Sequence, residues 1–229
     1  MKAQDYPRPA VAVDLVIFTV LDADLKLLMV RRREDPFSGC WALPGGFVRV
    51  GAAADQGEDL DEAARRELTE ETGLPARSVF LEQFHAFGRA GRDPRMRVIS
   101  VAYYALVSPE LAPFAVAGGD VAAVRWFSLS ELPAAELAFD HAEIIAVAAS
   151  RIRRSLDSTS IALELVPRSF SIAELRAVHE AIDGVTHDPA NFRRRFLRMV
   201  ADGLIEEAPG QRVTGKRRAK VYRFRRPRT

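Results

Sequence analysis

The chain has 229 residues, 48% of them hydrophobic and 28% charged, which is ordinary for a soluble globular protein with one large domain or two modest ones. Its net charge of +2 hides an asymmetry, because residues 158 to 229 hold 15 Lys+Arg against 8 Asp+Glu, whereas the preceding residues hold 18 against 23. No apolar run is long enough to span a bilayer, the N-terminus has no export signal and the single cysteine excludes an internal disulfide, so we expect a cytoplasmic protein without a membrane partner.

The first two thirds of the chain combine predicted strands with two predicted helices. Runs of β-branched, apolar and aromatic residues predict strands in AVAVDLVIFTV, LKLLMVRRR, WALPGGFV, SVFLEQFHAF, MRVISVAYYALV and VAAVRWFSL. A helix is expected over residues 59 to about 72, because Asp59 can cap it and Gly73 can end it. A second helix is predicted in DHAEIIAVAASRIRR. This mixture predicts an α/β or α+β sandwich in residues 1–155.

Residues 156–229 change character after the polar junction SLDSTS, the expected linker. Three helices are predicted in IALELV, SIAELRAVHEAI and DPANFRRRFLRMVADG, and two strands follow in LIEEAPGQRVTGKRRAKVYRFR. Three helices followed by a hairpin are typical of a winged helix-turn-helix domain. The basic charge of this region makes nucleic acid its expected partner.

The helix expected at residues 59 to 72 carries a cluster of carboxylates. Glu67, Glu70 and Glu71 are three and four residues apart, so they share one face, where three like charges repel unless a cation lies between them. Mg²⁺ prefers oxygen ligands and engages phosphates, which makes it the natural candidate. Arg66 can orient one of the carboxylates. Taken alone, however, the helix favours a solvated acidic surface without a ligand.

The motif around this helix favours a metal site over a solvated acidic surface. The arrangement of Gly46, Glu58 and Arg66-Glu67-Leu68-x-Glu70-Glu71-x-Gly73-Leu74 resembles the Nudix box of hydrolases that cleave nucleoside diphosphates linked to another group. The resemblance covers residues 10 to about 155 and implies a Nudix α/β/α sandwich with a mixed sheet. It also implies Mg²⁺ at Glu67, Glu70 and Glu71, with Glu70 and Glu71 catalytic if the chain is active.

One departure from the Nudix box is an insertion. The family pattern has five residues between its first glycine and first glutamate, whereas 11 separate Gly46 from Glu58 here, an excess of six within VRVGAAADQG. Hydrolysis needs the metal carboxylates and this loop to converge, and a displacement of about 1 Å can cost ~100-fold in rate. We therefore expect metal binding to survive and hydrolysis to be weak or absent.

Cationic and aromatic residues near the box are candidates for a nucleotide site. Arginine binds phosphate oxygens through paired hydrogen bonds, and the loop GRAGRDPRMR is rich in it. Aromatic side chains can stack on a base, although for each of them alone packing in the core is the simpler role. The candidate ligand-binding residues are Arg32, Trp41, Gly46, Phe47, Arg89, Arg92 and Arg95.

The third predicted helix of the C-terminal region interleaves arginines with apolar residues in NFRRRFLRM. We expect the apolar positions, Leu197 among them, to face the core while the arginines face phosphates or guanine edges. Asn191 can read adenine, and the basic loop GQRVTGKRRAK is a candidate wing on the DNA backbone. A solvated basic surface is the alternative. The candidate DNA-binding residues are Asn191, Arg193, Arg194, Arg195, Arg198, Arg212, Lys216, Arg217, Arg218 and Lys220.

Taken together, the two regions resemble the NrtR-type Nudix-related transcriptional regulators. The segments SFSIAELRAVHEAIDG, NFRRRF and GKRRAKVYRF carry this resemblance in the second region. It implies a repressor of NAD biosynthesis or salvage genes, a homodimer built through the Nudix domains, and ADP-ribose or a related nucleotide as effector. Because two-fold related helix-turn-helix units bind two-fold symmetric DNA, we expect a palindromic operator.

Two alternatives stay open. The intact carboxylates favour an active Mg²⁺-dependent ADP-ribose or nucleoside-diphosphate pyrophosphatase with an accessory nucleic-acid-binding domain, whereas the insertion counts against it. An RNA-processing Nudix protein is the weaker alternative, because a winged helix suits duplex DNA.

Overall fold

The computed structural model describes residues 7–51, 57–119, 121–156, 161–214 and 217–225. Contacts between Cα atoms divide the chain into two compact units. The first consists of Met1–Phe18, Leu27–Leu106 and Phe114–Arg151, and the second of Thr19–Lys26, Val107–Pro113 and Ile152–Thr229. The division expected after residue 155 stays a prediction, and most of the expected linker lies outside the described residues. None of the described helices is long and apolar enough to cross a membrane.

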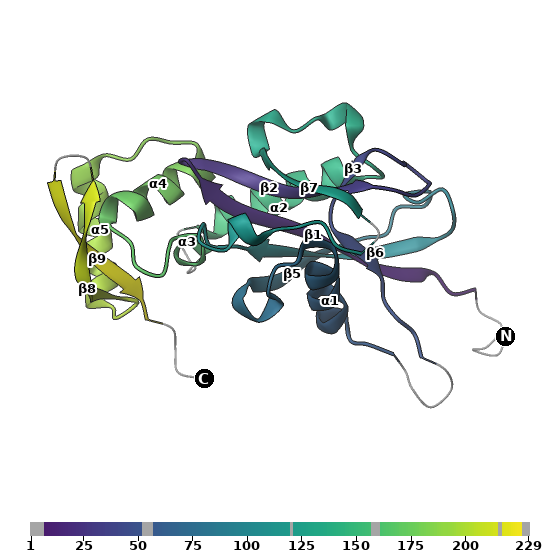
Figure 1. Cartoon of the computed structure of the whole chain (residues 1–229), viewed down its shortest axis with the longest axis horizontal. Coiled ribbons are helices and arrows are strands. Elements are labelled where there is room, and N and C mark those ends of the chain that lie inside the picture. The colour runs from purple at the N-terminus through teal and green to yellow at the C-terminus, as the bar shows by residue number, and fades with distance from the viewer. Residues whose placement is uncertain (1–6, 52–56, 120, 157–160, 215–216, 226–229) are drawn as a thin grey trace. The chain divides into compact units, whose positions relative to one another are not determined.

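A seven-stranded sheet underlies the first two thirds of the chain (Figure 1). Its strands are β1 (Ala10–Leu21), β2 (Asp24–Arg32), β3 (Trp41–Ala42), β4 (Gly45–Phe47), β5 (Phe80–Phe87), β6 (Val98–Leu106) and β7 (Val121–Ser128). The main order is β3-β2-β1-β6-β5, while β4 pairs with β1 and β7 with β2. β1 runs parallel to β6 and antiparallel to β4, so the sheet is mixed, as the resemblance implied.

β1 is the central strand of this sheet. Every residue from Val13 to Val20 is buried, which means that both of its faces are covered. Asp22 and Ala23, with φ angles of 54° and 58°, form the two-residue turn between β1 and β2. Asp14 is the one charged residue in the buried run, and a charge at such a position needs partners.

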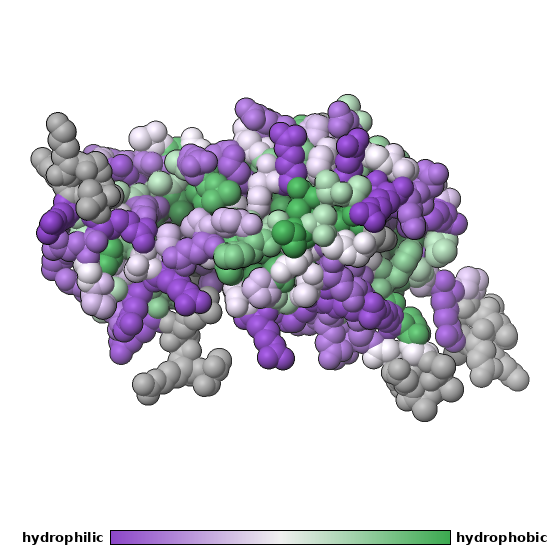
Figure 2. All heavy atoms as spheres, viewed as in Figure 1, coloured by the Kyte–Doolittle hydropathy of each residue, from purple (hydrophilic) through white to green (hydrophobic). Residues whose placement is uncertain are grey.

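Two longer helices belong to this part of the chain, α1 (Leu60–Thr72) and α2 (His141–Ser155). The apolar residues of α1, Ala63, Ala64 and Leu68, are fully buried. Figure 1 shows α1 below the strands, and its outer surface in Figure 2 is hydrophilic. Short 3₁₀ helices complete the connections at Ala76–Ser78, Ala112–Phe114, Leu129–Glu131 and Ala134–Glu136.

The ends of α1 are those that the sequence predicted. Asp59 occupies the N-cap position, and its N–H donates to Glu62 Oε2 at 3.0 Å. Gly73 ends the helix with a φ angle of 67°, and its N–H donates to the carbonyl of Thr69 at 3.0 Å. These caps fix where α1 begins and ends, and so which of its residues, Glu67 and Glu71 among them, are buried.

The second unit contains α3 (Ile161–Glu164), α4 (Ile172–Asp183), α5 (Pro189–Ala201), β8 (Ile205–Thr214) and β9 (Arg217–Phe224). Phe170 extends the β8–β9 hairpin, because it exchanges two backbone hydrogen bonds of 2.8 Å with Tyr222. Phe196 of α5 is buried against the ring of Tyr222, with 4.7 Å between the ring centroids. This arrangement confirms the winged helix-turn-helix prediction.

Candidate functional site

The carboxylates of Glu67 and Glu71 are buried beside the two glycines of β4. Glu71 Oε2 accepts a hydrogen bond of 3.1 Å from the N–H of Gly45. A Cβ atom at position 46 would lie 2.2 Å from Glu67 Oε1, so Gly46 leaves the space that this carboxylate occupies. Burial raises the pKa of Glu67, and the hydrogen bond from Arg66 opposes that rise. The glycines thus form a cradle for two of the three predicted metal ligands.

The third carboxylate, Glu70, is held by arginines. It accepts hydrogen bonds from Arg66 Nη1 at 3.0 Å and from Arg49 Nη2 at 3.1 and 3.3 Å. Arg66 Nη1 also donates to Glu67 Oε1 at 2.6 Å. Within the described parts of the chain, no three His, Cys, Asp or Glu side chains are arranged to hold a metal ion. Metal binding by Glu67, Glu70 and Glu71 together therefore stays a prediction.

The two ends of the inserted segment meet each other. The N–H of Glu58 donates to the carbonyl of Arg49 at 3.1 Å, and the N–H of Arg49 donates to Glu58 Oε1 at 2.8 Å. Arg66 donates to both oxygens of Glu58, at 2.8 and 2.6 Å, and these hydrogen bonds lower the pKa of Glu58 to about 2. Glu58, which directly precedes the N-cap of α1, is therefore held by Arg49 and Arg66, and the effect of the insertion on hydrolysis stays a prediction.

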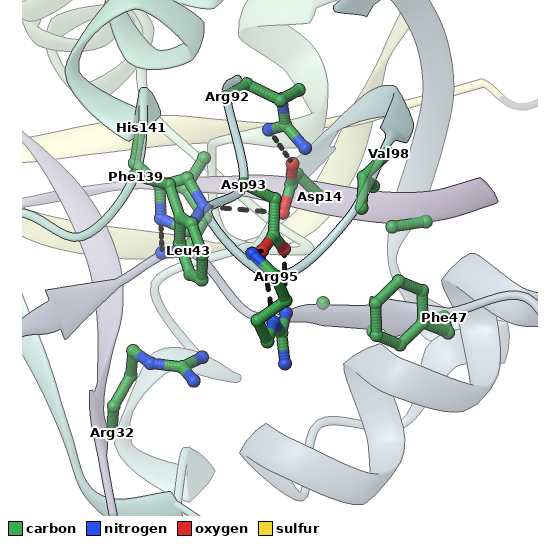
Figure 3. Close-up of a pocket in the computed structure, with 13 residues that line it drawn as sticks. Asp14, Arg32, Leu43, Phe47, Arg92, Asp93, Arg95, Val98, Phe139 and His141 are labelled. Carbon is green, nitrogen blue, oxygen red and sulfur yellow. Dashed lines mark hydrogen bonds and ion pairs between the residues drawn. The ribbon is translucent and has the colours of Figure 1, made fainter. Parts of the chain in front are cut away.

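A pocket lies beside β4, and a buried ion-pair network forms part of its lining (Figure 3). Arg92 donates to Asp140 at 2.9 and 2.7 Å and to Asp14 Oδ2 at 3.1 Å. Burial opposes the charge of Arg92, but these hydrogen bonds outweigh it and raise the pKa of its guanidinium. The lining residues are Ala12, Asp14, Arg32, Leu43, Gly45, Gly46, Phe47, Arg92, Asp93, Arg95, Val98, Phe139 and His141.

His141 joins this network as a neutral imidazole. The N–H of Leu43 donates to its Nδ1 at 2.9 Å, which places the imidazole proton on Nε2, 3.5 Å from Asp14 Oδ1. Burial lowers the pKa of His141, so the ring stays neutral around pH 7. Ser100 of β6 also donates to Asp14. Asp14 therefore ties β1 to three other segments of the fold.

Arginines and phenylalanines form the more exposed side of the pocket. The guanidinium carbon of Arg95 lies 5.4 Å from the ring centroid of Phe47 and 5.8 Å from that of Phe139, and Arg95 pairs with Asp93 at 2.8 Å. Arg32 lies 5.1 Å from the ring centroid of Phe139. Phe139 has a φ angle of 52°, which is rare for a bulky residue and requires its neighbours to hold it. Cations beside flat apolar rings suit a ligand with both phosphates and a base.

An adjoining pocket extends from the first one to α1. Both pockets are lined by Arg32, Leu43 and Gly45, and the adjoining one is also lined by Glu71. Arg32 thus borders both the aromatic side and the carboxylate helix. A diphosphate placed at Arg32 can reach the carboxylates while an attached base lies near Phe139.

The structure brings together five of the seven residues that the sequence predicted for the ligand, namely Arg32, Gly46, Phe47, Arg92 and Arg95. Trp41 packs instead edge-on against Phe127, with 4.8 Å between ring centroids, and Arg89 pairs with Glu143 at 3.7 Å, neither of them in the lining. The role of these residues in binding stays a prediction. The residues that sequence reasoning missed in the lining include Asp14, Asp93, Phe139 and His141.

The outer face of α5 is basic. Asp188 caps the helix by accepting a hydrogen bond of 2.8 Å from the N–H of Asn191, and Pro189 is its first residue. The buried face is set by Phe192 and Phe196. Leu197 follows Phe196 by about 100° around the helix and is 47% exposed, so the expectation that it faces the core is wrong. The exposed polar residues here are Asn191, Arg193, Arg194 and Arg198, while Arg195 is half-buried.

The β8–β9 hairpin holds the predicted wing. Arg212 pairs with Glu174 near the start of α4, and Lys220 pairs with Glu207 at 2.9 Å. Arg218 is exposed. Lys216 lies outside the described residues, and only the backbone of Arg217, in β9, is described. The hairpin surface drawn in Figure 2 is mostly hydrophilic, which suits a contact with the DNA backbone.

Comparison with known protein families assigns the domain that holds the pocket and the domain that holds the basic helix. The model described as the NUDIX domain matches residues 10–148, and the model described as the NrtR DNA-binding winged helix domain matches residues 162–224. The chain belongs to the NrtR-type Nudix-related transcriptional regulators.

Relatives of this NrtR-type chain agree with that assignment. The "ADPR responsive transcriptional repressor NtrR" of Acinetobacter baylyi is 34% identical over 96% of this chain and 84% of its own length. The "ADP-ribose pyrophosphatase" of Methanocaldococcus jannaschii is 41% identical over 61% of this chain and 73% of its own.

Solved NrtR structures from Shewanella oneidensis share the fold. The structure complexed with a 27mer DNA superposes with a TM-score of 0.74 at 30% identity, covering 94% of this chain and 93% of that one. The Nudix domain complexed with ADP ribose superposes with a TM-score of 0.56 at 32% identity, covering 66% of this chain and 94% of that one. An NrtR-type fold therefore extends over nearly the whole chain.

Proposed function

We propose that the chain is a transcriptional repressor whose winged helix binds operator DNA and whose Nudix domain binds ADP-ribose, which releases the DNA. The observation that carries this proposal is the presence, in one chain, of a basic recognition helix and of a pocket with arginines and aromatic rings that adjoins a carboxylate helix. The Acinetobacter baylyi relative is an ADP-ribose-responsive repressor by name, and the Shewanella oneidensis structures contain DNA and ADP ribose.

The pocket supplies the contacts that ADP-ribose requires. Arg32 and Arg95 offer guanidiniums to the diphosphate, and Phe47 and Phe139 offer rings to the adenine. Arg92 is less available, because its side chain is buried and bound by two aspartates, whereas Arg95 is half-exposed and pairs with one, Asp93. We assign Arg92 to holding the pocket in shape and Arg95 to contacting the ligand.

We propose that the cradle beside β4 binds a divalent cation. Nudix domains generally use a divalent metal. Glu67 and Glu71 both lie beside the glycines of β4, Gly46 has no side chain to fill the space of the Glu67 carboxylate, and carboxylate oxygens are the ligands that Mg²⁺ prefers. We propose that Glu67 and Glu71 bind Mg²⁺ with assistance from Glu70, and that the ion neutralises the diphosphate when bound.

Two further parts of the proposal, the regulated genes and the homodimer, rest on membership of the family and not on the geometry of the pocket. We propose that the chain represses NAD biosynthesis or salvage genes in the cytoplasm. We also propose that it binds a palindromic operator as a homodimer, because two-fold related recognition helices match two-fold symmetric DNA.

The proposal is tested by fluorescence anisotropy with labelled duplexes selected by the full-length protein from a randomised library. ADP-ribose should displace the protein from such a duplex, whereas AMP and ribose 5-phosphate at the same concentration should not. Linkage requires that DNA weaken ADP-ribose binding by the same factor by which ADP-ribose weakens DNA binding. Equal DNA affinity with and without saturating ADP-ribose would contradict the proposal.

A second candidate function is hydrolysis of ADP-ribose, which the intact carboxylates and the Methanocaldococcus jannaschii relative favour. We expect turnover with Mg²⁺ to be weak or absent, because the insertion lengthens the loop that approaches the carboxylates, although hydrogen bonds between Arg49 and Glu58 join its two ends. Steady-state turnover by the whole chain, compared with a variant lacking residues 52 to 57, separates the two functions. Efficient turnover by the unaltered chain would make it an enzyme as well as a regulator.

A further inference from the structure

We propose that Arg49 is a built-in counter-cation of the carboxylate helix, which a divalent cation must displace from Glu70 before all three carboxylates can bind it. This inference rests on the metal site proposed above. It starts from the position of the Arg49 guanidinium, whose Nη2 lies 3.1 Å from Oε1 and 3.3 Å from Oε2 of Glu70. Glu70 is the member of the predicted trio that lies outside the glycine cradle.

The backbone holds Arg49 in place for this contact. Its N–H donates to Glu58 Oε1 and its carbonyl accepts from the N–H of Glu58, while the preceding Val48 donates to the carbonyl of Val11 at 2.9 Å. Both sides of Arg49 are thus fixed to the sheet or to the start of α1. Because the backbone is already ordered, only the side chain loses conformational freedom when it reaches Glu70.

Of the two arginines at Glu70, Arg49 is the one that can leave. Arg66 is 15% exposed and holds Glu58 and Glu67 as well, so its loss would unpair two other carboxylates. The side chain of Arg49 is 64% exposed, and that of Glu70 is 45% exposed. Exposed ion pairs of this kind are weak and exchange readily with solvent and ions. A divalent cation can therefore take the place of Arg49 without disturbing the pairs of Arg66.

The charge of Arg49 sets how strongly the helix binds a cation. A guanidinium retained a few Å from a divalent ion repels it, and its attraction to Glu70 must be broken first. Removing this one charge should strengthen divalent binding by about 3- to 10-fold after screening by salt. The positive charge of Arg49 thus weakens the binding of a divalent cation at the metal site.

The test is a Mn²⁺ titration of the full chain without nucleotide, in which electron paramagnetic resonance measures free Mn²⁺ and calorimetry repeats the titration with Mg²⁺. Arg49→Gln should lower the Mn²⁺ Kd by about 3- to 10-fold, and Arg49→Glu should lower it further, because it replaces a repulsive charge by an added carboxylate. The matched control is Arg65→Gln on α1, the helix of the carboxylates, since Arg65 donates to the carbonyl of Ala76 at 3.0 Å.

The pathway through Glu70 gives a second readout. In a Glu70→Gln background, Arg49→Gln should change the Kd much less, because the partner of Arg49 is already neutral. Equal Kd values for the unaltered chain and Arg49→Gln, or weaker binding by Arg49→Gln, would overturn the inference while leaving the metal site in place. If neither protein binds Mn²⁺ while ADP-ribose still releases DNA, the metal site and this inference both fail, and the repressor function stands.

Discussion

Arg92 and Asp140, 48 residues apart in the sequence, form a buried ion pair in which the guanidinium donates to both carboxylate oxygens, at 2.9 and 2.7 Å. Asp14 is the second buried acceptor of Arg92. Replacing Arg92 by methionine should therefore destabilise the chain by about 3 to 5 kcal/mol, because two buried carboxylates lose their counter-charge. Urea denaturation of the whole chain measures this loss.

The control for this prediction restores charge balance. Adding Asp14→Asn and Asp140→Asn to Arg92→Met should recover part of the lost stability, since no uncompensated buried charge remains. A loss below about 1 kcal/mol for Arg92→Met would mean that the network is solvated and that Arg92 is available to a ligand after all.

Arg95 should contribute more to ligand binding than to stability. Its side chain is 39% exposed beside Phe47 and Phe139 and pairs with one buried carboxylate, Asp93, so Arg95→Ala should lower the free energy of unfolding less than Arg92→Met does. It should also weaken ADP-ribose binding by about 1.5 to 3 kcal/mol, or roughly 10- to 100-fold in Kd. Calorimetric titration with ADP-ribose measures the change in Kd. Arg151→Ala is the matched control, because Arg151 is an exposed arginine that pairs with Glu82 and does not line the pocket. Equal losses for the two variants would argue against the pocket as the diphosphate site.

The stability of the chain should depend on pH through Glu58. Hydrogen bonds from Arg66 lower its pKa from 4.5 to about 2, and the backbone and charge of Arg49 act in the same direction. A lowered pKa stabilises the folded state above pH 4.5, and this contribution is lost as the pH falls from 4.5 toward 2. The stability difference between the unaltered chain and Glu58→Gln should therefore narrow as the pH falls through that range, as measured by denaturation at each pH. A constant difference would show that Glu58 has no special pairing.

Leu197 should contribute to operator selection. It is 47% exposed between Arg193 and Arg194 on the outer face of α5, where an apolar side chain can contact the methyl group of thymine in the major groove. Replacing the contacted thymine by uracil in a selected duplex should weaken binding by about 0.8 kcal/mol, or roughly fourfold. In the Leu197→Ala variant, replacing this thymine by uracil should not change the DNA affinity. In the Arg193→Ala variant, the same replacement should still weaken binding roughly fourfold. If every thymine-to-uracil change affects the unaltered chain and Leu197→Ala alike, the contact does not exist.

Local patterns in the sequence predicted the elements of the fold well. The strands and helices have strong periodicity or caps, such as Asp59 and Gly73 at the ends of α1, and they lie where they were expected. The winged helix-turn-helix order was also confirmed. The parallel pairing of β1 with β6 lies beyond the reach of such patterns, because it depends on contacts between residues far apart in the chain.

The pocket was predicted only in part, for the same reason. Asp14, Asp140 and His141 meet through contacts across 48 to 127 residues, which no local pattern encodes. One signal was present, since Asp14 interrupts an otherwise apolar strand, and a charge there implies a buried partner. The length of the insertion was visible in the sequence as well, but the hydrogen bonds that close it were not.

The hydrogen bonds between Arg49 and Glu58 bring the two ends of the inserted segment together. The chain leaves and re-enters at neighbouring positions, so changes in the number of residues there need not move Glu58 or the carboxylates of α1. We expect such a point to tolerate foreign sequence, and it lies next to an arginine that is proposed to move when a cation binds. A fluorescent reporter inserted between residues 52 and 56 would turn the regulator into an indicator, reading out metal or nucleotide inside a living cell.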